Sequence, residues 1–412
     1  MREIDYWIWM SSLTGMGPVK ARSLLENFKH PGLVYDMSEA ELKKTGLLTA
    51  KNVEEILDPD KRKRVGEIYG IMLKNDIKII SIFDGNYPDK LRHIYDPPIA
   101  LYYKGNLDFS DFSIAAVGSR RTTYYGALSA KKLSYDLAMH GVRIISGLAR
   151  GIDSIAHGGC LDAGGKTTAV LGCGIDNIYP PENRELFDRI IKSGGLALSE
   201  YAPGMPPINH NFPARNRIIS GIASGVLVVE AANRSGSLIT AGYALEQGRE
   251  VFAVPGNIDS AYSKGTNRLI RDGAKMVLCA GDILEEFDYK EINDRSNDNN
   301  KNNNKEKDKD KKSEKSVEKV SGLNRKELNK ESLDKSANKS GSSKEKTDFS
   351  LFRGLSTEEI RVVKIIKNGI HHMDEIIERS NISAKEANNI LFMLEMKGVI
   401  VQLPGKLFEM CL

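Results

Sequence analysis

The sequence has few cysteines and no long apolar run. Its four cysteines, Cys160, Cys173, Cys279 and Cys411, form no CxxC pair and have no histidine at metal-ligand spacing. We therefore expect neither a disulfide framework nor a zinc site, and no bound cofactor. No segment approaches the roughly 18 apolar residues of a membrane span, and the first residues lack a signal-peptide pattern. These absences predict a cytoplasmic protein with no membrane partner.

Most of the chain also lacks an excess of positive charge. The net charge is +4, but residues 290–346 hold 17 Lys and Arg against 12 Asp and Glu, which leaves −1 for the remainder. No aromatic residue occurs between Tyr289 and Phe349, so this stretch cannot bury enough apolar surface to offset the entropy of ordering. We expect residues 289–348 to be a disordered charged linker. Any anion site elsewhere must be a local cluster.

Two patterns precede this linker. Residues 1–75 contain short helical stretches with Gly-rich turns, and residues 76–288 alternate short apolar runs with helical stretches. The runs are 77–82, 99–103, 112–118, 142–147, 167–172, 196–200, 225–231, 250–256 and 274–278. Several are apolar on both faces, as strands covered by helices on each side are. The pattern predicts the α/β class, with an open, parallel, doubly wound Rossmann-like sheet and ligands at the strand C-terminal ends.

The last segment, residues 349–412, carries three helical patterns and a terminal hairpin pattern. Ser356 with Glu359 and Ser383 with Glu386 have the spacing of capping boxes, so both serines can open helices. The stretch VIVQLPGKLFEM then reads as strand, Pro-Gly turn and strand. This order predicts a winged helix.

The stretch GGKTTAVLGCG, residues 164–174, contains fragments of two nucleotide-binding motifs. A P-loop requires Gly-x4-Gly-Lys-Thr between a strand and a helix, but here Cys160 holds the first position and GKT precedes a strand-like run. The second fragment has Asn177 in place of a third glycine and no acidic residue at the expected distance. We expect a connection followed by a tight turn rather than an ATP or NAD site.

Glycine-containing turns with arginine or hydroxyl side chains follow three of the apolar runs. At such a turn, backbone N–H groups, a hydroxyl and a guanidinium can converge on one phosphate. The turns are Gly118-Ser119-Arg120-Arg121, the segment 146–153 with Arg150, and Asn233-Arg234-Ser235-Gly236-Ser237. Each alone reads as a structural turn, but three on one edge of a sheet predict an anion-binding rim.

The segment 212–221 adds an aromatic ring and two arginines beside that rim. Arg215 and Arg217 lie two positions apart and diverge on a helix, so we expect one to face ligand and the other an internal carboxylate. Phe212 can stack on a base, because single-strand binding combines a basic groove with aromatic platforms. Core packing is the alternative for Phe212.

Six motifs occur in order over about residues 85–280: AVGSRRTT, ISGLARGIDSIAH, TTAVLGCGIDNIYPPEN, FPARNRIISG, VVEAANRSGSLITAGYALEQGR, and VFAVPG followed by KGTNRLI. Together they resemble the DprA/Smf family of DNA-processing proteins. The resemblance implies a small N-terminal helical domain of the helix-hairpin-helix or SAM-like type (1–75), an extended Rossmann-like domain (76–288) and a winged helix (349–412). It further implies a non-catalytic, commonly homodimeric protein that binds and protects incoming single-stranded DNA. Such a protein loads the RecA recombinase in natural transformation and homologous recombination.

The polar turns and the resemblance together give one set of candidate DNA-binding residues. They are Gly118, Ser119, Arg120, Arg150, Asn209, Phe212, Arg215, Asn216, Arg217, Ser235, Gly236, Ser237 and Lys264. Asn209 stands where family members often carry a lysine. That phosphate contact is therefore either lost or supplied by Lys264 or Arg184.

The N-terminal segment contains a second candidate DNA contact. Gly15 and Gly17 permit a tight turn of the helix-hairpin-helix type, whose free N–H groups can meet a DNA phosphate. Residues 43–48 resemble a degenerate second copy of this turn. A purely structural helical domain is an equally good interpretation.

The winged helix is a weaker candidate. Its expected recognition helix, residues 383–398, carries Lys385 and Lys397 against Glu386 and Glu395, and it has no arginine that could fork onto guanine. Contact with a protein is at least as good an interpretation as contact with DNA.

Two other functions compete with single-strand binding. Nucleotide-cleaving phosphoribohydrolases of the lysine-decarboxylase-like group have a related Rossmann core, but their PGGxGTxxE loop carries a catalytic glutamate. The corresponding residues 235–241 have no acid, and the next one is Glu246. A double-stranded-DNA transcription factor would depend on the winged helix alone. We therefore expect a DNA-binding protein rather than an enzyme.

Overall fold

The structure, a computed structural model, describes residues 1–13, 15–287, 356–367, 372–380, 382–396, 399–403 and 407–410. The described residues up to 287 belong to one compact unit, and those from 356 onward belong to a second. The linker expected at residues 289–348 lies outside the described residues, so it stays a prediction.

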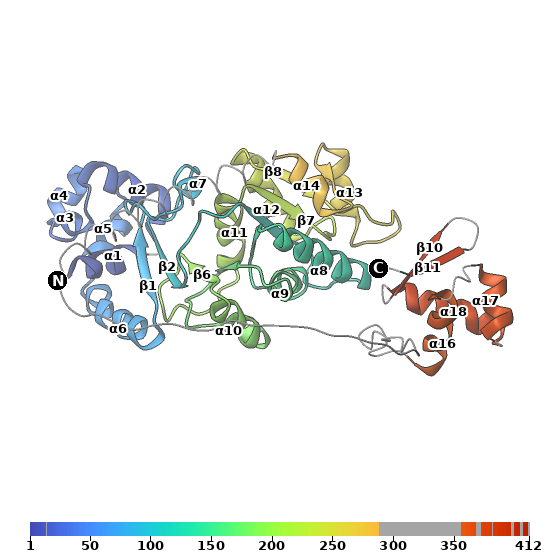
Figure 1. The fold of residues 1–412 in the computed structure, drawn as a ribbon. Coiled ribbons are helices and arrows are strands. Elements are labelled where there is room, and N and C mark those ends of the chain that lie inside the picture. Colours follow the sequence, from blue (N-terminus) through green and yellow to red (C-terminus); the bar gives the residue numbers. More distant parts are fainter. Residues whose placement is uncertain are drawn as a thin grey trace, which may run out of the picture. The chain divides into compact units, whose positions relative to one another are not determined.

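Six helices begin the first unit (Figure 1). They are α1 (Glu3–Ser11), α2 (Gly17–Phe28), α3 (Pro31–Tyr35), α4 (Glu39–Lys44), α5 (Ala50–Leu57) and α6 (Pro59–Asn75). Local sequence starts several of them, as where Ser38 and Glu41 form a capping box at α4. Their core contains the fully buried Trp9 and is continuous with Tyr102 of the sheet. The helices and the sheet share this core, so the core does not mark a boundary between them. The domain boundary expected near residue 75 therefore stays a prediction.

Nine strands form one sheet, and each coincides with one of the nine apolar runs, although β2 extends two residues beyond its run. They are β1 (Lys78–Ser81), β2 (Ala100–Gly105), β3 (Ser113–Val117), β4 (Arg143–Ser146), β5 (Thr167–Leu171), β6 (Leu196–Ser199), β7 (Gly225–Val228), β8 (Glu250–Ala253) and β9 (Lys275–Met276). The order across the sheet is β1-β2-β6-β5-β4-β3-β7-β8-β9. Every pair from β6 to β9 along this order is parallel. The predicted Rossmann-like α/β class is therefore confirmed.

The first two strands differ from the parallel direction expected of the sheet. β1 pairs with β2 in antiparallel fashion, and β2 pairs with β6 in the same way. A parallel pair needs a crossover, usually a helix, whereas α7 (Asp89–Arg92) supplies a single turn between β1 and β2. The apolar runs alone do not contain this information, because an edge strand of either direction can be equally apolar.

Helices cover both faces of the parallel part of the sheet. After α7 they are α8 (Tyr124–Met139), α9 (Ile152–Asp162), the 3₁₀ turn η1 (Pro181–Asn183), α10 (Arg184–Lys192), α11 (Asn211–Ile222), α12 (Gly236–Glu246), α13 (Lys264–Arg271) and α14 (Ala280–Glu285). Alternate residues of β3 face opposite layers. Ile114 packs in a cluster with residues of α8, α9 and α14, and Ala115 packs in one with residues of α11 and α12.

The order of the strands reverses next to β3. From β3 the chain adds β4, β5 and β6 on one side, and then β7, β8 and β9 on the other. In a doubly wound sheet this reversal leaves a crevice at the strand C-terminal ends, where ligands bind. The turns after β3 and β7 therefore flank the expected binding place.

The described residues of the second unit form three helices and a two-stranded sheet: α16 (Thr357–Lys367), α17 (Met373–Ser380), α18 (Ala384–Met396), β10 (Ile400–Leu403) and β11 (Leu407–Met410). Both predicted capping boxes are present, because Glu359 accepts a hydrogen bond from the Ser356 N–H and Glu386 accepts one from the Ser383 N–H. β10 and β11 are antiparallel. The predicted winged-helix order is confirmed.

Candidate nucleic-acid interface

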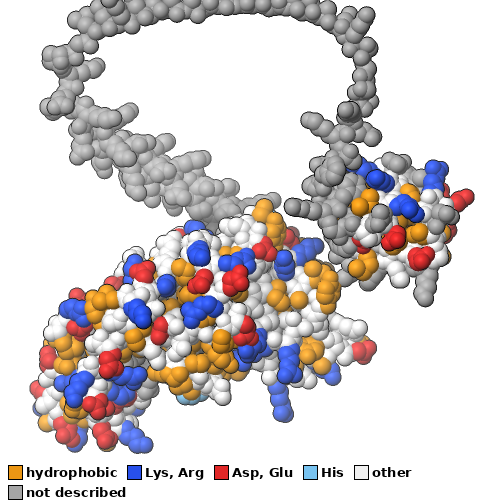
Figure 2. Space-filling view, turned by 90° about the horizontal axis from the view of Figure 1, so that it is seen from below, with side chains coloured by type: hydrophobic (Ala, Val, Ile, Leu, Met, Phe, Trp, Pro, Cys, Tyr) orange, Lys and Arg blue, Asp and Glu red, His pale blue; other side chains and the backbone are white. Residues whose placement is uncertain are grey.

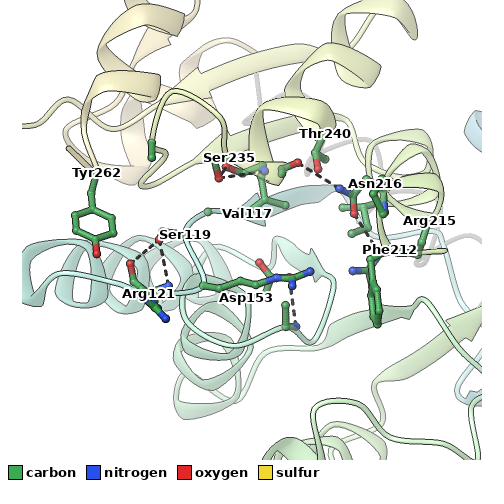
Figure 3. A pocket seen from close by; sticks show the side chains of 18 of the residues that line it. Val117, Ser119, Arg121, Asp153, Phe212, Arg215, Asn216, Ser235, Thr240 and Tyr262 are labelled. Carbon is green, nitrogen blue, oxygen red and sulfur yellow. Dashed lines mark hydrogen bonds between the residues drawn. The ribbon is translucent and has the colours of Figure 1, made fainter. Parts of the chain in front are cut away.

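A pocket of about 630 Å³ opens where the strand order reverses (Figure 3). Its walls come from the turn after β3, the start of α11 and the start of α12. Ten of the thirteen candidate residues line it: Gly118, Ser119, Arg120, Asn209, Phe212, Arg215, Asn216, Ser235, Gly236 and Ser237. The fold thus gathers groups that are more than 100 residues apart. Arg150, Arg217 and Lys264 do not line this pocket.

Two glycines allow the turns after β3 and β4 to touch. A Cβ at Gly118 would lie 2.5 Å from the Ile152 side chain, and a Cβ at Gly151 would lie 2.3 Å from the Ser119 carbonyl oxygen. Gly151 also has a φ of 78°, which disfavours any other residue. The Ser119 Oγ accepts from the Arg121 N–H at 3.1 Å, which fixes the turn. The two polar turns therefore form one rigid rim.

Arg120 and Arg150 differ in how much of their charge is free. Both are exposed, but Arg150 Nε donates to the Glu182 carboxylate, and this hydrogen bond holds the pKa of Arg150 above its ordinary value. Arg120 has no ion pair within the described part of the chain, and its guanidinium lies 5.7 Å from the centre of the Phe212 ring. Arg120 is therefore the better placed of the two to meet a phosphate.

Phe212 is neither a core residue nor fully exposed. Its ring packs against Gly172, where a Cβ would lie 2.8 Å from Phe212 Cδ1, and its centre lies 5.4 Å from that of Tyr179. Arg150 lies 6.0 Å from the Tyr179 ring centre. Phe212 and Tyr179, with Arg120 and Arg150 beside them, form an aromatic cluster at one end of the pocket. Sequence reasoning missed Tyr179, although it lies in the motif YPPEN.

Arg215 is a buried wall of the pocket. Its Nη1 donates to the carbonyl oxygens of Gly147, at 2.9 Å, and Val170. A Cβ at Gly147 would collide with both Arg215 and Asp153, so only glycine fits between them. Burial raises the pKa of the Asp153 carboxyl and lowers that of Arg215, although each partly offsets the effect on the other. Asp153 accepts from the Gly147 N–H at 3.1 Å, so both side chains hold the turn after β4 in place.

Arg217 points away from the pocket, as one of the two arginines was expected to do. It is 3% exposed and pairs with Glu200 at 2.7 Å and with Asp96 at 3.0 Å. With its guanidinium in this internal network, Arg217 offers no donor to a ligand. We therefore leave it out of the proposed interface.

The start of α12 forms the opposite wall. Ser235 caps the helix, its Oγ lies 2.8 Å from the Ser237 Oγ, and a Cβ at Gly236 would meet nothing within 4 Å. Asn216 donates to the Gly236 carbonyl at 3.4 Å and ties α11 to this turn. An open helix N-terminus with two hydroxyls suits an anion. Lys264 is exposed at the start of α13, outside the pocket lining.

The stretch GGKTTAVLGCG forms no phosphate loop. Lys166 lies 3.9 Å from both Asp108 and Asp111, and the buried Arg143 binds Asp111 at 2.6 Å. Gly172 makes room for Phe212, as described above. These residues therefore have structural partners, in agreement with a connection followed by a tight turn.

The helix-hairpin-helix-like turn also has an internal partner. The Gly15 N–H donates to both carboxylate oxygens of Glu55, at 3.2 and 3.0 Å, and Lys61 pairs with the same carboxylate. A Cβ at Gly15 would lie 2.6 Å from Glu55 Oε2. A carboxylate thus occupies the position that a phosphate would take, which favours the structural interpretation of this turn.

Among the described residues, no group of three or more His, Cys, Asp and Glu side chains could hold a metal ion. None of the described helices is both long and apolar enough to cross a membrane. On the face of the first unit seen in Figure 2, Lys and Arg are interspersed with Asp and Glu. An anion site therefore depends on a local cluster of basic side chains, as the charge distribution along the sequence predicts.

Comparison with known proteins identifies the family. Residues 78–288 match the family model described as DNA recombination-mediator protein A, and residues 352–406 match the DprA winged helix domain. The chain belongs to the DprA/Smf family. The sequence resemblance to this family is thereby confirmed.

Individual relatives agree with this assignment. The chain is 50% identical over 210 residues to the DNA processing protein DprA of Streptococcus pneumoniae, which covers 51% of this chain and 74% of the relative. It is 38% identical over 287 residues to the protein Smf of Synechocystis, covering 68% and 72%. The solved structure of the Streptococcus pneumoniae DprA superposes with a TM-score of 0.56 at 40% identity, covering 70% of this chain and 99% of that one.

Proposed function

We propose that the protein binds single-stranded DNA in the pocket at the sheet reversal, protects the strand and loads a RecA-type recombinase onto it. One observation carries the proposal: Arg120, an exposed arginine with no ion pair to any described residue, lies beside the Phe212 ring in a pocket whose other wall is an open helix N-terminus. Arginine and helix N–H groups suit phosphates, and a partly exposed ring suits a base. A ligand with both features is a nucleic-acid strand.

Single-stranded DNA fits this arrangement better than a duplex. A duplex stacks its bases inside, so it presents none to an aromatic ring at the end of a pocket. Duplex readers place a helix in the major groove, whereas this interface consists of turns at strand ends. The described part of the winged helix adds no arginine-rich face that would change this preference.

The proposed function is non-catalytic. A phosphoribohydrolase would need a free carboxylate in the pocket. Asp153 lines the pocket, but its side chain is 7% exposed and accepts hydrogen bonds from the Gly147 and Ala149 N–H groups. Glu230, at the end of β7, is 2% exposed and accepts hydrogen bonds from the N–H and hydroxyl of Thr123 at the start of α8. Both acids have structural partners, so neither is placed to act as a general base.

Fluorescence anisotropy tests the proposal. We expect the full chain to bind a 20-residue oligo-dT more tightly than a duplex of the same length at each salt concentration. Affinity should fall as salt rises, because neutralised phosphates release counterions. Equal affinity for the two forms of DNA would contradict the proposal, and release of base from nucleotides in a parallel assay would favour the enzyme.

The partner and the assembly need their own measurements. RecA loading predicts faster RecA assembly on single-stranded DNA precoated with a single-strand-binding protein when this chain is added. A homodimer predicts twice the chain mass in light scattering. Unchanged RecA assembly would remove the loading role and leave DNA binding intact.

A further inference from the structure

A second aromatic residue lines the pocket at the end away from Phe212. Figure 3 shows the Tyr262 ring on one side and Phe212 on the other, with Arg121 and Ser235 between them. Among the labelled residues, Ser119 and Arg121 lie beside the Tyr262 ring in this view. Tyr262 is half-buried, as Phe212 is. The pocket is therefore a trough with an aromatic ring at each end.

The position of Tyr262 is fixed by backbone contacts. Its carbonyl accepts from the Ala231 N–H at 2.8 Å, which ties it to the end of β7. The loop after β8 is closed, because a Cβ at Gly256 would lie 2.1 Å from Ser263 Oγ. Tyr125 donates to the Pro255 carbonyl at 2.8 Å and holds the same loop against α8. Tyr262 thus sits on a rigid support.

Cations accompany this second ring as they accompany the first. Arg121 is exposed and lines the trough, and Lys264 is exposed two residues after Tyr262. Neither forms an ion pair within the described residues, whereas Arg268 and Arg271 farther along α13 both pair with Asp272. Each end of the trough therefore combines a ring with free positive charge.

We infer that Tyr262 is a second base-stacking platform, so that a single strand crosses the whole trough from the aromatic cluster at Phe212 to Tyr262. This inference rests on the proposed function and adds the path of the strand. The phosphates between the two stacked bases pass the start of α12 and the Ser119 turn. Lys264 contacts a phosphate where the strand leaves the trough beside Tyr262. Lys264 would thus supply a phosphate contact that Asn209 cannot make.

Variants at Tyr262 separate stacking from charge. We expect Tyr262→Leu to weaken binding of a 20-residue oligo-dT by about 5- to 150-fold, the range that about 1–3 kcal/mol per stacked base gives. Tyr262→Phe should stay within about twofold, because the ring remains. The salt dependence should not change in Tyr262→Leu, whereas Lys264→Ala should reduce its slope by about 0.7 for one lost phosphate contact. Tyr135→Leu, at an exposed tyrosine of α8 outside the pocket, is the matched control.

A fluorescent variant gives a second measurement that does not need a loss of binding. Tyr262→Trp should show a change in indole emission when oligo-dT is added. The two native tryptophans, Trp7 and Trp9, are buried in α1 at 8% and 0% exposure and form a constant background.

The outcomes distinguish this inference from the proposed function. If the unmodified chain binds no single-stranded DNA, the proposed function fails. If it binds, but Tyr262→Leu matches the Tyr135→Leu control and the new tryptophan does not respond, the strand does not reach Tyr262 and the inference is overturned alone.

Discussion

The guanidinium of Arg217 faces the carboxylate of Glu200 in a two-point ion pair, with Nη1 2.9 Å from Oε2 and Nη2 2.7 Å from Oε1. Burial by itself lowers the pKa of Arg217, but Glu200 and Asp96 outweigh burial and hold it above its ordinary value. The Arg217–Glu200 pair joins α11 to the end of β6, and the second ion pair, with Asp96, joins α11 to the segment before β2. Arg217 thus stabilises the frame that carries the pocket.

Arg217→Met should therefore destabilise the fold. Removing one partner of a buried ion pair leaves the carboxylates uncompensated, and we expect the free energy of unfolding to fall by about 3–5 kcal/mol. Urea denaturation measures this change. The exposed Arg64→Met serves as the control and should stay within about 0.5 kcal/mol. A stable Arg217→Met protein that has lost DNA affinity would place Arg217 in the interface after all.

Arg120 and Lys166 both lie in stretches that resemble phosphate-binding turns, but their substitutions should affect DNA binding differently. Arg120→Ala removes a free guanidinium at the trough and should weaken oligo-dT binding by about 1.5–3 kcal/mol. Lys166→Ala removes a partner of Asp108 and Asp111 just before β5, at the other end of the strands from the trough. It should weaken oligo-dT binding by about 0.5 kcal/mol or less. Titration at one salt concentration compares them, after thermal melts show that both are folded. A larger loss in Lys166→Ala would mean that the GKT stretch contacts the ligand.

His157 should make the protein less stable in mild acid. Burial, with a smaller effect of Arg215, lowers its pKa from 6.5 to about 3. Its Nδ1 donates to Thr167 Oγ1 at 2.7 Å, because that hydroxyl already donates to the Ile144 carbonyl. Below pH 6.5 the unfolded chain binds a proton that the folded chain excludes, so stability is lost as pH falls toward 3.

The expected loss from His157 is about 2 kcal/mol between pH 7 and pH 5. Urea unfolding at the two pH values measures it, and His157→Gln, which cannot take up the proton, should show a correspondingly smaller difference. Equal pH dependence in the two proteins would mean that His157 titrates normally in the folded state.

Glu55→Ala tests the turn at Gly15. Loss of the carboxylate removes the protein partner of the exposed Gly15 N–H, which water can then bind, and we expect the free energy of unfolding to fall by about 0.5–1.5 kcal/mol. DNA affinity of the folded variant should not change. Tighter duplex binding by this variant would show instead that Glu55 blocks a working helix-hairpin-helix site.

The sequence by itself determined most of the secondary structure and indicated the place of the proposed site. All nine strands begin in the short apolar runs, and only β2 extends beyond its run. The helices at Ser356 and Ser383 begin where capping boxes occur, because both features depend on neighbouring residues. The α/β alternation then brings the polar turns to one edge of the sheet. The motifs quoted for the family resemblance lie in the same turns.

Only the tertiary structure decided which charges are free and which rings face the pocket. Arg215 and Arg217 are two residues apart, yet one contacts carbonyl groups and the other two distant carboxylates. Arg150 has Glu182 as a partner, whereas Arg120 has none among the described residues. Tyr179 and Tyr262 reach the pocket region from separate loops. A side chain's charge, burial and stacking depend on partners far along the chain, and these are brought together only when the sheet and its helices pack.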